Sequence, residues 1–108
     1  MSWTVEILNA TVEQELEELP DDMKARFRKI VELIQEFGIV NVGMPYVRPL
    51  EGKLWEMRLK GKAGISRALY VTVKGRRVVV VRVFVKKTQK TPAREIKLAL
   101  KRAAEIES

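Results

Sequence analysis

Six basic residues lie where strands and strand ends are predicted, and their side chains could do chemistry on a phosphate. Arginine and lysine side chains held at fixed positions bind phosphate oxygens and stabilise negative charge that develops during a reaction. A lysine crowded by other cations has a lowered pKa and can also transfer protons. The sequence therefore predicts a phosphate-binding surface made by Arg58, Lys60, Arg67, Arg82, Lys86 and Lys87.

One segment predicts how some of these charges are positioned. The valine-rich run before Lys86 is typical of a strand that is buried on both faces. Thr91 has the residue type of a helix N-cap, and Pro92 has that of the first helical position. Lys86, Lys87 and Lys90 would then leave a core strand just before a helix begins. A helix N-terminus with positive side chains beside it favours an anion such as phosphate.

The composition excludes several classes of site. The chain has no cysteine, which excludes disulfides and thiolate metal sites, and no histidine, which removes the commonest general base and metal ligand. It has no glycine-rich phosphate loop of known spacing. Glu56 is the only acidic residue between Glu51 and Glu95, so paired carboxylates on one strand face are missing too. We therefore expect no metal and no cofactor.

The formal net charge of +7 is unevenly distributed. Residues 1–47 hold 4 basic and 9 acidic residues, a balance of −5, whereas residues 48–108 hold 17 basic and 5 acidic residues, a balance of +12. This asymmetry favours a basic face for a polyanion, although high net charge also keeps proteins soluble. No signal peptide or membrane-length apolar run is found, so we expect a soluble, cytoplasmic protein with no membrane partner.

The first part of the chain predicts a strand followed by a helical hairpin. Alternation at residues 3–7 is typical of a short strand with one buried face. Thr11 and Gln14 have the spacing of a capping box for a helix that stops at Pro20. A second helix with one apolar stripe then ends at Gly38. The hairpin could serve as a crossover, so the first strand could lie parallel to a neighbour.

The second part predicts a loop, three strands and a helix. Residues 39–53 contain two prolines and two glycines and predict a long irregular connection. Residues 54–60 and 65–74 predict two strands, and a turn at Gly75 leads into the valine-rich strand. A helix with one apolar face ends the chain. We expect an α+β fold, a twisted and mostly antiparallel sheet of about four strands with helices on one face.

Two segments resemble the RelE/HigB superfamily of toxins, and in particular its phage-derived HigB-like or RelE-like subgroup. The run from Phe84 to Glu95 is similar to the C-terminal signature of these toxins, most specifically in Lys86-Lys87-Thr88-Gln89-Lys90-Thr91-Pro92. A second match joins residues 54–59 to residues 65–70. The order of elements matches as well, so the resemblance implies a single RelE-like domain over residues 1–108.

The resemblance implies a toxin that cuts messenger RNA on the ribosome and so inhibits translation. It implies an antitoxin partner, expected to be a small helix-turn-helix protein, besides the ribosome and messenger RNA. The basic positions of the family fall on Arg58, Arg67 and Lys87, which would act on the scissile phosphate. We expect further RNA contacts from Lys60, Arg82, Lys86, Lys90 and Arg94.

Other interpretations stay open at this point. One family basic position holds Glu56, and the tyrosine or histidine near the last helix of the family has no counterpart. These departures favour a protein that binds RNA or the ribosome without cleaving. A third interpretation is a purely protein-binding module whose basic face holds an acidic antitoxin. Arg67 could pair with Glu56, Arg58 and Lys60 could belong to a solvated strand face, and Lys86 and Lys87 could protect a strand end from aggregation.

Overall fold

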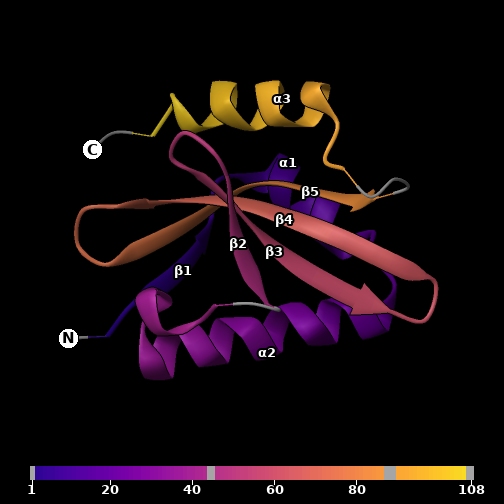
Figure 1. Cartoon of the computed structure of the whole chain (residues 1–108), viewed down its shortest axis with the longest axis horizontal. Coiled ribbons are helices and arrows are strands. Elements are labelled where there is room, and N and C mark those ends of the chain that lie inside the picture. The colour runs from indigo at the N-terminus through magenta and orange to yellow at the C-terminus, as the bar shows by residue number, and fades with distance from the viewer. Residues whose placement is uncertain (1, 44–45, 87–89, 107–108) are drawn as a thin grey trace.

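The described strands form one sheet in the order β1-β5-β4-β3-β2 (Figure 1). The structure is a computed structural model that describes residues 2–43, 46–86 and 90–106. The antiparallel strands are joined by tight turns, and β1 lies parallel to β5, as the crossover argument predicted. The strands are β1 (Thr4–Ile7), β2 (Val47–Glu51), β3 (Leu54–Gly61), β4 (Gly64–Val73) and β5 (Arg77–Lys86).

The expected count of about four strands was one too low. β2 lies inside the segment that we expected to be irregular, and it pairs antiparallel with β3. Its sequence contains Pro49, which cannot donate a backbone hydrogen bond to a neighbour. β2 tolerates this proline because it is the edge strand of the sheet. An edge strand with a proline gives only a weak sequence signal.

Two helices cover one face of the sheet. They are α1 (Ala10–Glu17) and α2 (Asp21–Phe37), and a short 3-10 helix, η1 (Ile39–Asn41), follows them. Ile30 and Ile34 of α2 pack into the same core as Met57 and Tyr70 of the sheet. Gly38 ends α2 with φ +85°, as expected for a glycine at that position.

The predicted capping box of the first helix was wrong. Asn9 caps α1 instead, because its Oδ1 accepts a hydrogen bond from the backbone N–H of Val12 at 3.0 Å. Thr11 lies inside the helix. Asparagine is as good an N-cap residue as threonine, so local sequence alone did not separate the two positions.

The third helix, α3 (Ala93–Ala103), lies on the opposite face of the sheet (Figure 1). The expectation that all helices share one face was therefore wrong. β4 and β5 are apolar on both sides, and their second face packs against Ala99 and Ala103 of α3. The valine-rich strand is thus buried on both faces, as predicted. None of the helices in the described part of the chain is both long and apolar enough to span a membrane.

A β-bulge in β5 changes the face of the sheet to which the side chains after Val80 point. Leu69 pairs with Arg82 and Tyr70 pairs with Val80, so Val81 is an extra residue in the strand. Val81 consequently packs on the α3 side, whereas Val83 packs on the α1 and α2 side. Without the bulge these two valines would lie on the same face.

Candidate functional site

The candidate site is built around Glu56, a fully buried carboxylate in β3. Its Oε2 accepts a hydrogen bond from Nη1 of Arg67 at 2.8 Å, and its Oε1 accepts one from Nε of Arg48 at 2.9 Å. The hydroxyl of Thr91 lies 3.4 Å from both carboxylate oxygens and donates to them. Three separate segments, β2, β4 and the approach to α3, therefore meet on one side chain.

The register of the sheet explains this meeting. Arg58 and Arg67 are directly opposite each other on β3 and β4, and Arg48 is opposite Glu56 on β2 and β3. Glu56 is diagonal to Arg67, a separation that long side chains bridge. All four side chains thus belong to one patch of the sheet.

Positive charge exceeds negative charge in this patch. The patch holds three arginines, at positions 48, 58 and 67, and one carboxylate, that of Glu56, which pairs with Arg48 and Arg67, so two positive charges are in surplus. Burial lowers the pKa of Arg67, Glu56 opposes that change, and the charges of Arg58 and Arg48 add to it. Among the described residues no carboxylate pairs with Arg58, and the buried Nε atoms of Arg58 and Arg67 have no hydrogen-bond partner. Such unmet cationic donors suit an anion.

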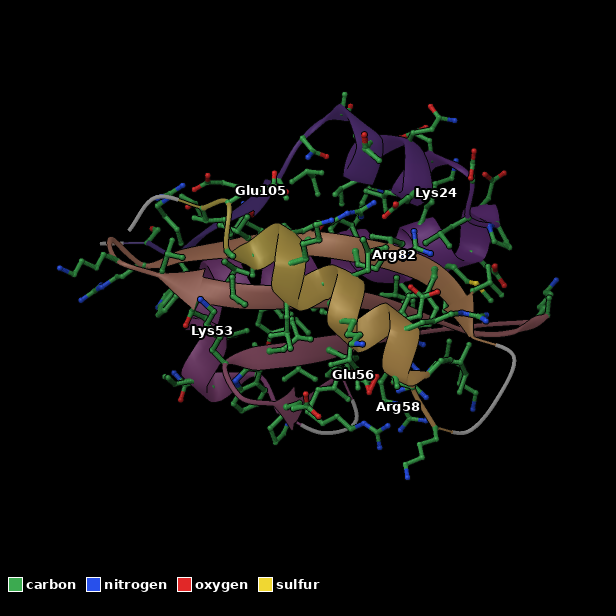
Figure 2. All side chains as sticks on the ribbon, turned by 90° about the horizontal axis from the view of Figure 1, so that it is seen from above. Lys24, Lys53, Glu56, Arg58, Arg82 and Glu105 are labelled. Atoms are coloured by element: carbon green, nitrogen blue, oxygen red, sulfur yellow. The ribbon has the colours of Figure 1, made fainter. Side chains whose placement is uncertain are left out.

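The start of α3 differs from the prediction in its N-cap residue. Pro92 is the N-cap residue and α3 begins at Ala93, one position later than expected. Thr91 is buried and its hydroxyl binds Glu56 instead of capping the helix. Figure 2 shows Glu56 and Arg58 near this end of α3. The N-terminus of α3 thus lies beside the arginine cluster.

Arg82 is held by carboxylates from two helices. Its Nε lies 2.6 Å from Oε1 of Glu95 in α3, and its Nη1 lies 2.7 Å from Oε2 of Glu15 in α1. Arg102 of α3 also donates to Glu15, at 3.0 Å. The hydrogen bond with Glu95 raises the pKa of Arg82, and the charge of Glu15 adds to this effect. The charge of Arg82, which we expected at the RNA, is therefore balanced by contacts that join α1, β5 and α3.

The structure describes only some of the remaining predicted residues. Lys60 follows Arg58 on β3 and is exposed, and Lys90 and Arg94 are exposed on either side of the start of α3. Lys86 is the last residue of β5. Lys87 lies outside the described residues. Arg48 was missed in the sequence, because Arg48 lies in a strand that was predicted to be an irregular connection. Glu56 was interpreted there as a departure from the family, whereas the structure places Glu56 at the centre of the cluster.

The arginine cluster offers electrostatic stabilisation of an anion. No group of three or more acidic side chains able to hold a metal ion occurs within residues 2–43, 46–86 and 90–106. Fixed guanidinium groups can stabilise a phosphate whose charge increases during a reaction. The three arginines therefore have the charge and the hydrogen-bond donors that bind a phosphodiester.

Comparison with known proteins decides the family. The family model described as phage-derived protein Gp49-like matches residues 14–104. The chain belongs to this Gp49-like family. The match covers the cluster residues of β2, β3 and β4 and the start of α3. No curated protein matches this Gp49-like chain in sequence.

Solved structures show that the Gp49-like chain has the RelE fold. The Escherichia coli toxin RelE, as a mutant in the free state, superposes with a TM-score of 0.64 at 14% identity, covering 94% of this chain and 98% of RelE. The RelE–RelB complex from Pyrococcus horikoshii gives 0.58 at 23% identity, with coverage of 81% and 98%. The YoeB–YefM complex from Staphylococcus aureus gives 0.57 at 9% identity, with coverage of 80% and 99%. The resemblance that the sequence indicated is confirmed as a shared fold.

Proposed function

We propose that this Gp49-like protein is the toxin of a toxin–antitoxin pair and cuts messenger RNA on the ribosome, in the cytoplasm. The observation that carries the proposal is the arginine cluster around Glu56, with its surplus of two positive charges, on a fold shared with the toxin RelE. The balance of +12 in residues 48–108 supports a polyanionic partner of large size. Messenger RNA and the ribosome together present such a surface.

The proposed reaction is an internal transfer of the RNA phosphate. The 2′-oxygen forms a bond to the neighbouring phosphorus, the bond from phosphorus to the 5′-oxygen breaks, the 2′-hydroxyl loses a proton and the leaving oxygen gains one. Arg58 would contact the phosphate and stabilise the charge on its oxygens. Arg67 is only 3% exposed, so its charge would act on the phosphate without direct contact. Lys87 is proposed to take part in the proton transfers.

A cognate antitoxin is proposed as the protein partner. Two of the solved structures with this fold are complexes of two proteins, RelE with RelB and YoeB with YefM. An antitoxin could cover the arginine cluster or could prevent entry into the ribosome from the acidic helical hairpin. Co-expression with a neighbouring small gene, such as one that encodes a helix-turn-helix protein, followed by co-purification tests the complex.

The function is tested by induction in a bacterium. We expect growth and translation to stop, and we expect primer extension on translated messages to detect new 5′ ends. The same messages made untranslatable by loss of their start codon should stay intact, because cleavage needs the ribosome. Normal growth at high expression, with no partner co-purifying, contradicts the proposal.

A second candidate is a protein that binds RNA or the ribosome without cleaving. It is favoured by the pairing of Arg67 with Glu56, which neutralises one cation of the cluster. It is also favoured by the lack of any aromatic residue or histidine in residues 88–96, where the family places an acid or base. Arrested translation without new 5′ ends is the outcome that this candidate predicts.

A further inference from the structure

Arg58 of the Glu56 cluster also lines a hollow of about 250 Å³, together with two further cations. Its described lining combines three positive side chains, one aromatic ring and one aliphatic side chain, with no carboxylate among them. The lining residues are Arg26, Tyr46, Arg58, Lys60 and Ile65. The hollow is a little smaller than pockets that hold drug-sized ligands, which are about 300–1,000 Å³. Its volume and charge suit one nucleotide.

We propose that this hollow binds one unpaired nucleotide of single-stranded RNA. In this proposal Arg26 and Tyr46 form the surface on which the base stacks, and Arg58 and Lys60 bind the adjacent phosphate. The proposal rests on the proposed function, because it takes RNA as the partner, and it adds a subsite and two residues to it. Neither Arg26 nor Tyr46 was expected to be functional from the sequence.

The stacking surface is already assembled in the structure. The guanidinium carbon of Arg26 lies 5.8 Å from the centroid of the Tyr46 ring, within the range of a cation–π contact. The backbone of Tyr46 is fixed, because its N–H donates to Gly43 at 2.9 Å and its carbonyl accepts from the N–H of Arg58 at 2.8 Å. Aromatic rings and arginine planes are the side chains on which unpaired RNA bases stack.

The two cations proposed to bind the phosphate, Arg58 and Lys60, are not neutralised by a carboxylate among the described residues. In the described part of the chain neither Arg58 nor Lys60 forms an ion pair, and the buried Nε of Arg58 has no hydrogen-bond partner. Tyr46 and Arg58 are linked directly through their backbones, so a ring and a cation are held next to each other. A base and its own phosphate require this adjacency. A base inside a duplex cannot reach the ring, so the hollow should prefer single strands.

Binding of a labelled seven-nucleotide single-stranded RNA, followed by fluorescence anisotropy, tests the subsite. Tyr46→Leu should weaken binding about fivefold to 100-fold, which is the loss expected for one stacked base, whereas Tyr46→Phe should bind like the parent. Phe37→Leu is the matched control, because Phe37 is an exposed aromatic residue at 55% exposure and does not line the hollow. Circular dichroism checks that each variant is folded.

A second pair of variants keeps the test valid if Tyr46→Leu does not fold. Arg26→Gln should weaken binding, whereas Arg28→Gln, which removes the same charge from an exposed position of the same helix, should weaken it less. An RNA with one abasic nucleotide at the bound position should lose affinity for the parent but not for Tyr46→Leu. Equal losses for both proteins overturn the stacking role.

The two proposals fail in different ways. Parent-like binding by both Tyr46→Leu and Arg26→Gln overturns the subsite and leaves the proposed function intact. A parent protein that binds duplex RNA as tightly as single strands, or binds neither, also overturns the subsite. Growth arrest on induction and cleavage of translated messages are measured separately from RNA binding. Only their absence contradicts the proposed toxin function.

Discussion

Oε2 of Glu56 lies 2.8 Å from Nη1 of Arg67, and the side chains are 0% and 3% exposed. The two residues are diagonal neighbours on β3 and β4. A buried pair of this kind loses much hydration, which its mutual attraction and further hydrogen bonds must offset. Arg48 and Thr91 supply those further bonds to Glu56. Glu56 therefore acts as a positioning residue for the basic cluster.

Removing either partner should destabilise the protein strongly. We expect Glu56→Ala or Arg67→Ala to lower the free energy of unfolding by about 3–5 kcal/mol, because Glu56→Ala leaves Arg67 buried without a carboxylate and Arg67→Ala removes the buried cation beside Glu56. The effects should not add in the double variant, since the second substitution removes the charge that the first left unpaired. Urea unfolding measures all three. Glu51→Ala, an exposed control in β2, should change stability little, and additive losses would contradict the coupling.

The same burial makes Arg67→Ala a poor test of catalysis, so Arg58 is the better choice. We expect Arg58→Gln to relieve growth arrest and to leave stability almost unchanged, because Arg58 has no ion-pair partner within the described residues. Lys53→Gln is the matched control, since it removes one charge from an exposed turn away from Arg58 (Figure 2). Colony counts and incorporation of labelled amino acid provide the readout. Equal toxicity of both variants would remove Arg58 from the site.

Ribosome or RNA association should weaken as salt rises. Each phosphate contact releases counterions, so three contacts to a single strand give a slope of about −2 in a plot of log K against log salt. Arg58→Gln should reduce the slope by about 0.7 if Arg58 contacts one phosphate. Lys53→Gln should leave the slope as it is. A flat response in the parent would make the charge asymmetry a matter of solubility alone.

Acid should weaken the contact between α1, β5 and α3. Burial alone would raise the pKa of Glu15, but hydrogen bonds from Arg102 and from the backbone N–H of Val83, with the charges of Arg82 and Arg102, bring it below its usual 4.5. A carboxylate whose pKa is lowered by folding contributes stability above its unfolded pKa, and that contribution is lost as pH falls through the folded pKa.

Glu15→Gln tests this acid dependence. At neutral pH it should lower the free energy of unfolding by about 2 kcal/mol, because Arg82 and Arg102 lose a charged hydrogen-bond partner. The difference from the parent should shrink as pH is lowered below 4.5, the unperturbed value for Glu15. Unfolding curves between pH 3 and pH 7 measure it, in steps of about half a unit. Glu32→Gln, an exposed substitution in α2, should show no such trend.

Local patterns were sufficient for most of the elements. Period-two alternation at Trp55, Met57 and Leu59 predicted β3, the apolar stripe through Ile30 and Ile34 predicted α2, and a valine-rich run predicted a strand buried on both faces. These features depend on neighbours a few residues apart, which the sequence displays directly. The edge strand β2 and the face chosen by α3 depend on contacts between distant segments, so both were missed.

The sequence alone determined the residue types of the site, its basic character and the resemblance to RelE-like toxins. Only the tertiary structure decided which charges stay available. Strand register placed Glu56 against Arg67 and Arg48, and a bulge in β5 brought Arg82 to the carboxylates of α1 and α3. A shift of one residue in register would turn these side chains to the other face of the sheet and break the contacts. Charge pairing therefore depends on long-range geometry, which composition and spacing do not contain.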